Sequence, residues 1–241
     1  MIKLSPRLQI IYDMVPECNT LADVGCDHGY LSISLVANGI AGQAIAMDVN
    51  KGPLESARAN VASMGLLDRV SFRLSDGLAK LDADEADVIC ICGMGGALIR
   101  RILDARLDVA KRAKVLILEP QSEYRLLREF LVHNHFYFID EMLCTEEGKI
   151  YPIMKVAFSD ETVCQYREYE MAYGPIIIKK APDLLSSLLE KNKNEYSSIL
   201  RKLNAMDEAD LSVPITKRKA ELLEELELIK QVELEMEESH G

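Results

Sequence analysis

No stretch of this chain approaches the roughly 20 consecutive apolar residues that a membrane-spanning helix needs. The opening residues, MIKLSPRLQI, lack the apolar core of a secretory signal peptide. We therefore expect a water-soluble protein with no membrane partner and the cytoplasm as its compartment. With 49% apolar residues in 241 positions, the chain can form one substantial core and a small second domain.

Cysteine spacing excludes two further classes. The six cysteines are scattered without a C-x-x-C pair, so the ligand spacing of a zinc site is missing and no metal is expected. A disulfide framework is not expected at this length and in this compartment. Cys90 and Cys92 alternate along a predicted buried strand, where cysteine behaves as a small hydrophobic residue. We predict structural roles for all six except Cys26, which lies in a glycine-rich turn.

An excess of positive charge is also missing. The formal net charge is −11, whereas binding to phosphates needs a basic surface. Net charge averages over all faces, however, and some segments are locally basic. Their cations are Arg100, Arg101, Arg106, Lys111, Arg112, Lys114, Arg125 and Arg128. These segments can share one side of a parallel sheet, so a nucleic-acid partner and an ordinary solvated face both stay open.

The stretch 20–31, TLADVGCDHGYL, organises the first part of the chain. A mostly apolar, strand-like run over 21–24 enters a turn with glycines at Gly25 and Gly29, and a helix is predicted to begin at Tyr30. A strand that turns through glycines into a helix gathers backbone N–H groups and the positive helix end at one point. This arrangement suits a polar ligand.

Three later predicted strands also end in acids or glycines. Asp48 follows the strand 43–47, and its carboxylate can accept both hydroxyls of a ribose. Asp76 follows the strand 70–74, where a carboxylate can accept from an adenine amino group. The strand 87–92 ends in Gly93-Met94-Gly95-Gly96. Because the carboxyl ends of parallel strands form one edge where ligands bind, we predict a nucleoside site there.

Together these segments resemble the bacterial tRNA (adenine-22-N1)-methyltransferases, which are class I S-adenosylmethionine-dependent methyltransferases. The turn resembles the methyltransferase pattern D/E-x-G-x-G-x-G, except that Asp27 stands where the middle glycine is expected. The blocks D-x-G-x-D-H-x-Y-L and G-M-G-G carry the closer resemblance, and the likeness covers the whole chain. It implies methyl transfer from S-adenosyl-L-methionine to N1 of adenine 22, in the D-arm of tRNA. The products would be N1-methyladenosine and S-adenosyl-L-homocysteine.

The cofactor is expected along the strand ends. Asp23 would orient its methionine amino group through the turn, Asp48 would hold the ribose, and Asp76 would hold the adenine. The predicted cofactor-binding residues are Asp23, Gly25, Gly29, Asp48, Asp76, Gly77, Gly93 and Met94.

The chemistry needs few protein groups. Methyl transfer from a sulfonium is an in-line displacement, so positioning can provide most of the acceleration. Adenine N1 lies on the Watson–Crick edge, so a paired base must first be opened or flipped. Methylation makes the ring cationic, and a carboxylate near the base would stabilise that charge or remove an N6 proton. We assign Asp27 as the leading catalytic candidate, with His28 and Tyr30 beside it. Alternatively, His28 only stabilises the turn, and Tyr30 is only a packing residue.

Substrate contacts are predicted on the other side of the same edge. Amino-methyltransferases carry an N/D-P-P-Y loop where this chain has GMGG, and the absence of that loop fits a ring-nitrogen acceptor better than an amino group. Alternatively, GMGG is only a glycine-rich helix start and does not contact a substrate. Arg7, on a predicted helix over 4–15, would reach the cofactor carboxylate or an RNA phosphate, or else lie free on the surface. The predicted substrate-binding residues are Arg7, Gly95, Gly96, Pro120 and Gln121.

Strands and helices alternate through the first 160 residues. A fifth strand over 114–118 precedes a helix that Ser122 is expected to cap, and segments 136–144 and 150–158 form a closing hairpin. The expected fold is α/β, a Rossmann-like seven-stranded class I methyltransferase sheet whose last strand is antiparallel. The hairpin separates this pattern from a nicotinamide-binding Rossmann domain. Residues 1–160 are therefore the predicted S-adenosylmethionine-binding domain.

Residues 161–241 are the predicted second domain, because glycine almost disappears there while leucine, glutamate and lysine dominate. Two apolar stripes predict two long helices joined by a turn over 207–214, packed as an antiparallel coiled-coil hairpin. The stripes are Leu184, Leu188, Tyr196, Ile199 and Leu203, then Ile215, Leu222, Ile229 and Met236. The resemblance implies that this hairpin contacts tRNA. We expect a monomer, and dimerisation through the hairpin stays open.

Three alternatives remain at this point. The chain could methylate another RNA base or a small molecule. It could be a nucleotide-binding oxidoreductase, although that fingerprint wants glycine where Asp27 stands. It could also be a non-catalytic RNA-binding protein with a retained nucleoside pocket, although Asp48, Asp76 and both turn glycines are intact.

Overall fold

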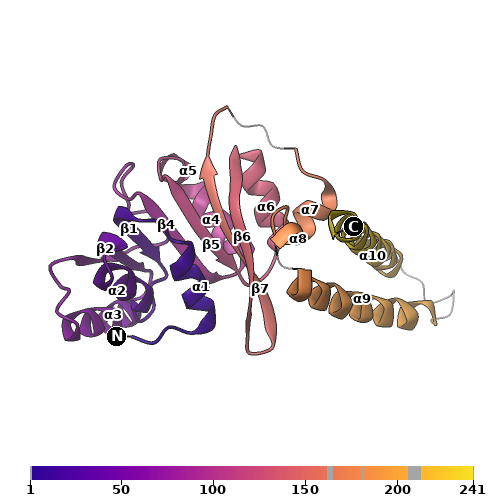
Figure 1. Ribbon diagram of the computed structural model, residues 1–241, viewed down its shortest axis with the longest axis horizontal. Coiled ribbons are helices and arrows are strands. Elements are labelled where there is room, and N and C mark those ends of the chain that lie inside the picture. Colours follow the sequence, from indigo (N-terminus) through magenta and orange to yellow (C-terminus); the bar gives the residue numbers. More distant parts are fainter. Residues whose placement is uncertain (1, 162–164, 181, 206–212, 241) are drawn as a thin grey trace. The chain divides into compact units, whose positions relative to one another are not determined.

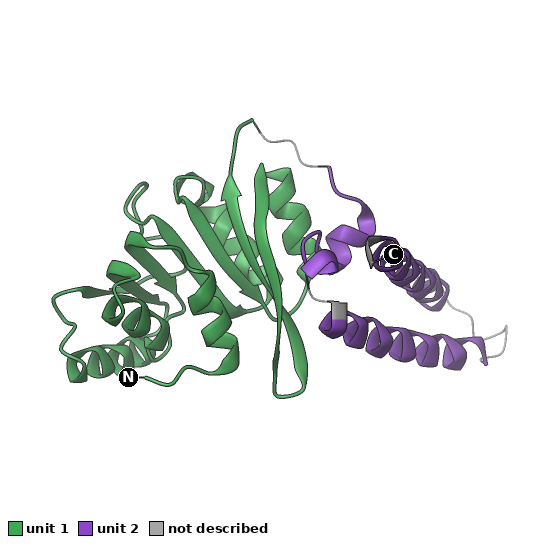
Figure 2. Cartoon of the chain, viewed as in Figure 1, with its two compact units in different colours: residues 1–164 green, residues 165–241 purple. Residues whose placement is uncertain are grey.

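The computed structural model describes residues 2–161, 165–180, 182–205 and 213–240. The chain divides into two compact units, residues 1–164 and 165–241, coloured green and purple in Figure 2. Cys164, for which a structural role was predicted, lies outside the described residues. In the described ranges, no helix combines the length and the apolar composition that crossing a membrane requires.

The first unit is built on one seven-stranded sheet with the order β3-β2-β1-β4-β5-β7-β6 (Figure 1). The strands are β1 Cys18–Val24, β2 Ala41–Asp48, β3 Val70–Leu74, β4 Val88–Met94, β5 Val115–Pro120, β6 Phe136–Glu146 and β7 Lys149–Phe158. Strands β1 to β5 pair in parallel, and β7 runs antiparallel to both β5 and β6. The predicted seven-stranded sheet with its closing hairpin is confirmed.

Six helices accompany this sheet in two contacting groups, α1 to α3 and α4 to α6. Their bounds are α1 Pro6–Met14, α2 Tyr30–Ala37, α3 Lys51–Ser63, α4 Gly96–Ala105, α5 Leu107–Ala110 and α6 Tyr124–His133. Helix α1 lies within the predicted range 4–15 and begins at Pro6, because the Ser5 hydroxyl accepts from the Leu8 N–H at 3.3 Å and Pro6 occupies the first turn. Every residue of β5 is buried, as expected for a central parallel strand covered on both faces.

Gly96 allows α4 to start against the end of β5. Its N–H donates to the Ser122 carbonyl at 3.0 Å. A Cβ at this position would lie 2.5 Å from the Ser122 carbonyl oxygen and 2.7 Å from that of Glu123. The glycine is therefore required by backbone packing, whatever it contributes to substrate binding.

We expect Gly96→Ala to lower the free energy of unfolding by about 1–3 kcal/mol, because the added methyl overlaps backbone that cannot rotate away. Gly52→Ala is the matched control. Gly52 lies in α3 and a Cβ there meets nothing within 4 Å, so the exchange should be neutral or stabilise by up to about 1 kcal/mol. Urea unfolding measures both. Equal effects of the two substitutions would contradict the packing role of Gly96.

Ser122 does not cap α6, so that prediction was wrong. Glu123 occupies the N-cap position with φ 47° and makes no side-chain capping bond. The Ser122 hydroxyl instead donates to the Glu123 carboxylate at 2.6 Å, and this carboxylate accepts from the Ala97 N–H at 3.3 Å. The left-handed backbone at Glu123 turns both side chains away from α6 and toward the start of α4.

In the described residues of the second unit, the regular secondary structure is helical. The helices are α7 Glu168–Tyr173, α8 Ile177–Lys180, α9 Pro182–Asn204 and α10 Val213–His240. Helices α9 and α10 contact each other, and Lys193 Nζ lies 2.9 Å from Glu233 Oε1 across that contact. Most of the predicted turn over 207–214 falls outside the described residues, and coiled-coil packing of the pair stays a prediction.

The buried stripe of α9 is shifted by one residue from the predicted one. Leu185 and Leu189 are 0% and 2% exposed, whereas the predicted Leu184 and Leu188 are only half-buried. Helix α9 contacts both α8 and α10, so its buried side faces more than one neighbour. On α10 the most buried residues include Leu222, Ile229 and Val232, so the first two of these were predicted correctly.

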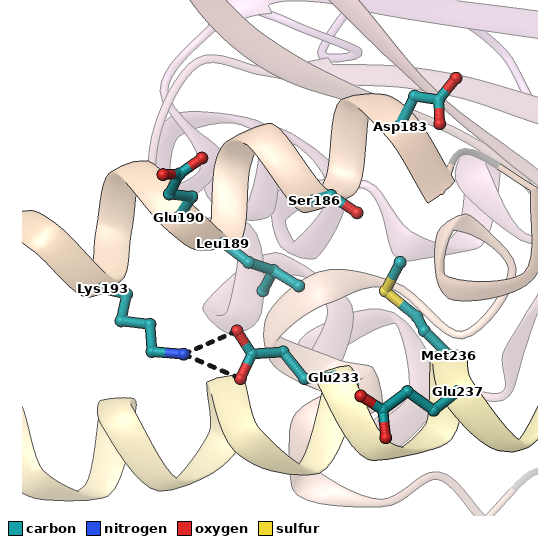
Figure 3. Close-up of a pocket in the computed structure, with 8 residues that line it drawn as sticks. All are labelled: Asp183, Ser186, Leu189, Glu190, Lys193, Glu233, Met236 and Glu237. Carbon is teal, nitrogen blue, oxygen red and sulfur yellow. Dashed lines mark hydrogen bonds and ion pairs between the residues drawn. The ribbon is translucent and has the colours of Figure 1, made fainter.

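A groove of about 840 Å³ lies between α9 and α10 (Figure 3). Its charged residues are Asp183, Glu190, Glu233 and Glu237, with Lys193 as the cation bonded to Glu233. Four carboxylates against one amine make this groove unsuitable for a phosphate backbone.

Candidate active site

The turn between β1 and α2 has the left-handed backbone that its glycines allow. Gly25 has φ 76° and Gly29 has φ 71°. The N–H groups of Gly25 and Cys26 donate to the Met47 carbonyl at 2.8 and 3.0 Å, so the turn is bonded to the end of β2. The Gly29 N–H closes the turn on the Cys26 carbonyl at 2.7 Å.

Both turn glycines are also sites of close approach. A Cβ at Gly25 would collide with the Met94 methyl group, which therefore lies directly over the turn. A Cβ at Gly29 would lie 3.1 Å from the Ala57 Cβ of α3. Gly25 thus keeps the turn open toward β4, and Gly29 lets α3 pack close to it.

Asp23 is buried below this turn at 6% exposure. The Ser32 hydroxyl donates to its carboxylate at 2.6 Å. Burial disfavours the charged form and raises the pKa of Asp23 to about 6, and the charge of Asp48 adds to the rise.

This pKa shift predicts a pH dependence of stability. Asp23 binds its proton more tightly in the folded chain than in the unfolded chain, where the pKa is about 3.8. Its contribution is therefore most favourable below about pH 4 and is lost as pH rises to about 6, by roughly 3 kcal/mol. We expect the Asp23→Asn variant to gain stability relative to wild type over this range. Urea unfolding at about pH 4 and pH 7 tests this, with the exposed Asp76→Asn as control. A constant difference between wild type and the Asp23→Asn variant would contradict it.

The three predicted catalytic residues lie together at the mouth of the turn. Asp27 Oδ1 is 3.6 Å from His28 Nε2, and the rings of His28 and Tyr30 stack with centroids 5.5 Å apart. The Asn60 amide of α3 donates to the His28 carbonyl at 3.0 Å and so fixes the loop from behind. Asp27 keeps φ 49°, a conformation that glycine would adopt at less cost.

These residues open into a cavity of about 280 Å³ at the carboxyl ends of the parallel strands. It is smaller than the groove of the second unit, but it is lined by the predicted catalytic residues, which the groove does not contain. Its lining includes eight predicted site residues: Arg7, Asp23, Gly25, Asp27, His28, Tyr30, Gly93 and Gln121. The other lining residues are Leu8, Cys26, Leu31 and Cys92.

Asp48 and Asp76 follow the next two strands of the same edge. The Asp48 carboxylate accepts from the Asn50 N–H at 2.8 Å, and its carbonyl accepts from the Ser75 N–H at 2.8 Å. The ends of β1, β2 and β3 are therefore directly bonded to one another. Asp76 is exposed. Gly77 has φ 53°, and a Cβ there would lie 2.7 Å from Ile102, so this glycine lets the loop pack against α4.

The predicted substrate residues fall into two groups. Gly95 and Gly96 form the start of α4, while Pro120 pairs with Met94 at the end of β5. The Gln121 N–H donates to the Met94 carbonyl at 2.8 Å, which ties the two strand ends together. None of Gly29, Asp48, Asp76, Gly77, Met94, Gly95, Gly96 and Pro120 is among the residues that line the cavity.

Arg7 lines the cavity, but its guanidinium is already paired with carboxylates. Its Nη1 lies 2.9 Å from Glu119 Oε2 and its Nε lies 2.7 Å from Glu146 Oε2. Across the part of the chain that the structure describes, no three His, Cys, Asp or Glu side chains come together in a way that could hold a metal ion.

The family model for TrmK, described as tRNA (adenine(22)-N(1))-methyltransferase, matches residues 21–231. The chain belongs to the TrmK family. A tRNA (adenine(22)-N(1))-methyltransferase from Bacillus subtilis (strain 168) is 37% identical over 193 residues, which cover 80% of this chain and 77% of that protein.

Solved structures agree with membership of the TrmK family. The crystal structure of the B. subtilis M1A22 tRNA methyltransferase TrmK matches with a TM-score of 0.87 at 32% identity, covering 96% of this chain and 99% of that one. Streptococcus pneumoniae Sp1610, crystallised in complex with S-adenosyl-L-methionine, matches with a TM-score of 0.83 at 31% identity. That match covers 95% of this chain and 99% of the other.

Two features of this TrmK-family site were missed by the sequence reasoning. Val49 is 59% exposed and Leu74 is 42% exposed, so apolar side chains border the acids at the ends of β2 and β3. An apolar residue directly after a strand-end acid was the available signal for Val49. Glu119 is fully buried beside Arg7 and Gly93, and nothing in its local sequence distinguishes it from other strand-end acids.

Proposed function

We propose that this protein transfers a methyl group from S-adenosyl-L-methionine to N1 of adenine 22 in tRNA, giving N1-methyladenosine and S-adenosyl-L-homocysteine. The observation that carries the proposal is the cavity at the strand ends. There a glycine turn suited to the cofactor and an acid held in a glycine conformation share one opening. Family membership adds the target base.

The residues of this edge fit the cofactor. Gly25 lines the cavity and is half-buried, and the Met94 methyl group lies where a side chain of residue 25 would be. Asp48, at the next strand end, would accept the ribose hydroxyls, and the exposed Val49 would cover one face of the adenine. Asp76 would accept from the adenine amino group. When bound, the cofactor supplies the methyl group on its sulfonium.

The protein's own contribution is mainly to aim the base. The paired His28 and Tyr30 rings present a flat aromatic surface at the cavity mouth, on which a flipped adenine can stack. Asp27 would then stabilise the positive charge that develops on the ring, or accept a proton from N6. The turn bonds to Met47 and Asn60 hold these groups in place before substrate arrives.

We further propose that the helical unit contacts the tRNA and that the protein acts as a monomer in the cytoplasm. Leu222 and Ile229 of α10 are already buried within one chain, where α10 contacts α7, α8 and α9, which supports a monomer. Light scattering at working concentration tests this, and a dimer would overturn it.

In the decisive experiment, the full-length protein is incubated with methyl-labelled S-adenosyl-L-methionine and an unmodified tRNA transcript. Nuclease digestion then maps the labelled nucleotide. We expect label in N1-methyladenosine at position 22, and none in a transcript with guanosine at that position. Label in another nucleotide, or transfer only to small molecules, would overturn the proposal.

A further inference from the structure

The pairing of β4 with β5 contains a bulge at Gly93. Cys92 pairs with Glu119 and Met94 pairs with Pro120, so the register shifts by one residue at this point. A bulged residue is left without a partner in the ladder, and such bulges often redirect a side chain next to a site. The Gly93 N–H donates instead to Glu119 Oε2, at 2.6 Å.

The Glu119 carboxylate thus takes the place of the backbone carbonyl that would accept from the Gly93 N–H in a regular ladder. The side chain is 0% exposed, and the same Oε2 accepts from Arg7 Nη1 at 2.9 Å. Glu119 Oε1 has no hydrogen-bond partner among the described residues. Burying a carboxylate this completely is costly, and an apolar residue would fill the space at lower cost. What distinguishes Glu119 from a buried carboxylate that only packs is its bond to the unpaired N–H of the Gly93 bulge.

The bulge also determines where Met94 lies. The Met94 carbonyl accepts from the Gln121 N–H at 2.8 Å, and its methyl group lies in the space that a Gly25 side chain would need. A continuous set of contacts therefore runs from Arg7 through Glu119 and the Gly93 N–H to Met94. It ends on the glycine turn of β1.

We propose that Glu119 is a positioning residue for the methyltransferase reaction. Its carboxylate, held by Arg7, fixes the Gly93 bulge and thereby sets Met94 against the cofactor turn at Gly25. This inference rests on the proposed function, because the bulge is inferred to position the cofactor and the base that react beside it.

Glu119→Gln tests this inference, because the amide keeps the shape and can still accept from Gly93 but loses the charge. We expect kcat/KM for tRNA methylation to fall about tenfold and the Kd for S-adenosyl-L-homocysteine to rise by a similar factor, since bonds to a charged acceptor are the stronger ones. Arg7→Met should give a similar loss, and Arg7→Lys should recover part of it. The double variant should be no worse than either single one, because the pair acts as a unit.

Glu141→Gln is the matched control. Glu141 and Arg128 form a second buried pair, 2.9 Å apart with 0% and 1% exposed side chains, on β6 and α6. We expect this exchange to lower the thermal midpoint at least as much as Glu119→Gln while leaving the Kd for S-adenosyl-L-homocysteine unchanged.

Two outcomes would overturn the inference: wild-type kcat/KM and Kd in Glu119→Gln, or an equal rise in Kd in Glu141→Gln. A wild-type protein that neither binds S-adenosyl-L-homocysteine nor methylates tRNA would instead contradict the proposed function. The two failures are therefore distinguishable.

Discussion

Asp27→Asn is expected to lower kcat for tRNA methylation by about 100-fold to 10,000-fold, the usual contribution of a positioned acid–base or charge-stabilising group. Affinity for S-adenosyl-L-homocysteine should change by less than about twofold, because the cofactor turn is held by backbone bonds to Met47 rather than by the Asp27 side chain. Single-turnover assays with labelled cofactor measure the chemical step, and calorimetry measures the affinity.

The backbone of this position makes the substitution unusually clean. Asp27 has φ 49°, and asparagine tolerates that region as well as aspartate does. Asp84→Asn is the matched control, because Asp84 also has a positive φ, 66°, and its carboxylate pairs with Arg112 away from the cavity. Wild-type kcat in the Asp27→Asn variant would remove the catalytic assignment. A comparable loss in both variants would assign the effect to backbone conformation instead.

The features that sequence could predict are those encoded over short distances. The turn from Gly25 to Gly29 follows from glycine spacing after an apolar run, and the strand-end acids Asp48 and Asp76 follow from where each strand stops. The seven-stranded sheet with its antiparallel β7 likewise follows from alternating patterns and a hairpin turn. Each depends on residues within a few positions of one another.

Features that depend on distant partners could not be predicted. The importance of Glu119 appears only when Arg7, 112 residues earlier, reaches it, and when the β4–β5 register shifts at Gly93. Ser122 has the composition of a helix cap, yet the left-handed backbone of Glu123 directs it elsewhere. On α9, Leu185 and Leu189 are buried among contacts with α8 and α10, and periodicity within α9 did not distinguish them from Leu184 and Leu188.

The charges of the second unit separate along its length. The groove residues Asp183 to Lys193 lie in the first half of α9 and Glu233 to Glu237 lie near the end of α10, so the helices run antiparallel. The carboxylates of the groove in Figure 3 lie toward that end. The opposite end, defined here as the basic end, carries exposed or half-exposed cations on the last turn of α9 and the first turns of α10. They are Arg201, Lys202, Lys217, Arg218 and Lys219.

If the helical unit contacts tRNA, as proposed, we expect its basic end to do so, because five cations lie close together there. Replacing all five cations with glutamine is expected to weaken tRNA binding by about 100-fold to 1,000-fold at physiological salt, through lost counterion release. The slope of log affinity against log salt should become shallower by about 3 to 5. Filter binding across a salt series measures both quantities. Cofactor affinity should not change, because the unit that holds the strand-end cavity is left intact.

Three lysines nearer the acidic end provide the control for this variant. Lys191, Lys193 and Lys230 lie on the same two helices. Lys193 and Lys230 pair with Glu233 and Glu227, just as Lys217 and Arg218 of the basic end pair with Glu221, so both variants remove ion-paired cations. Because neighbouring carboxylates repel a phosphate backbone, glutamine at these three positions should leave the salt slope within about 0.5 of wild type. An unchanged slope in the five-residue variant would exclude the basic end as an RNA contact. Equal losses of tRNA affinity in both variants would show that RNA binding depends on overall charge and not on one end of the hairpin.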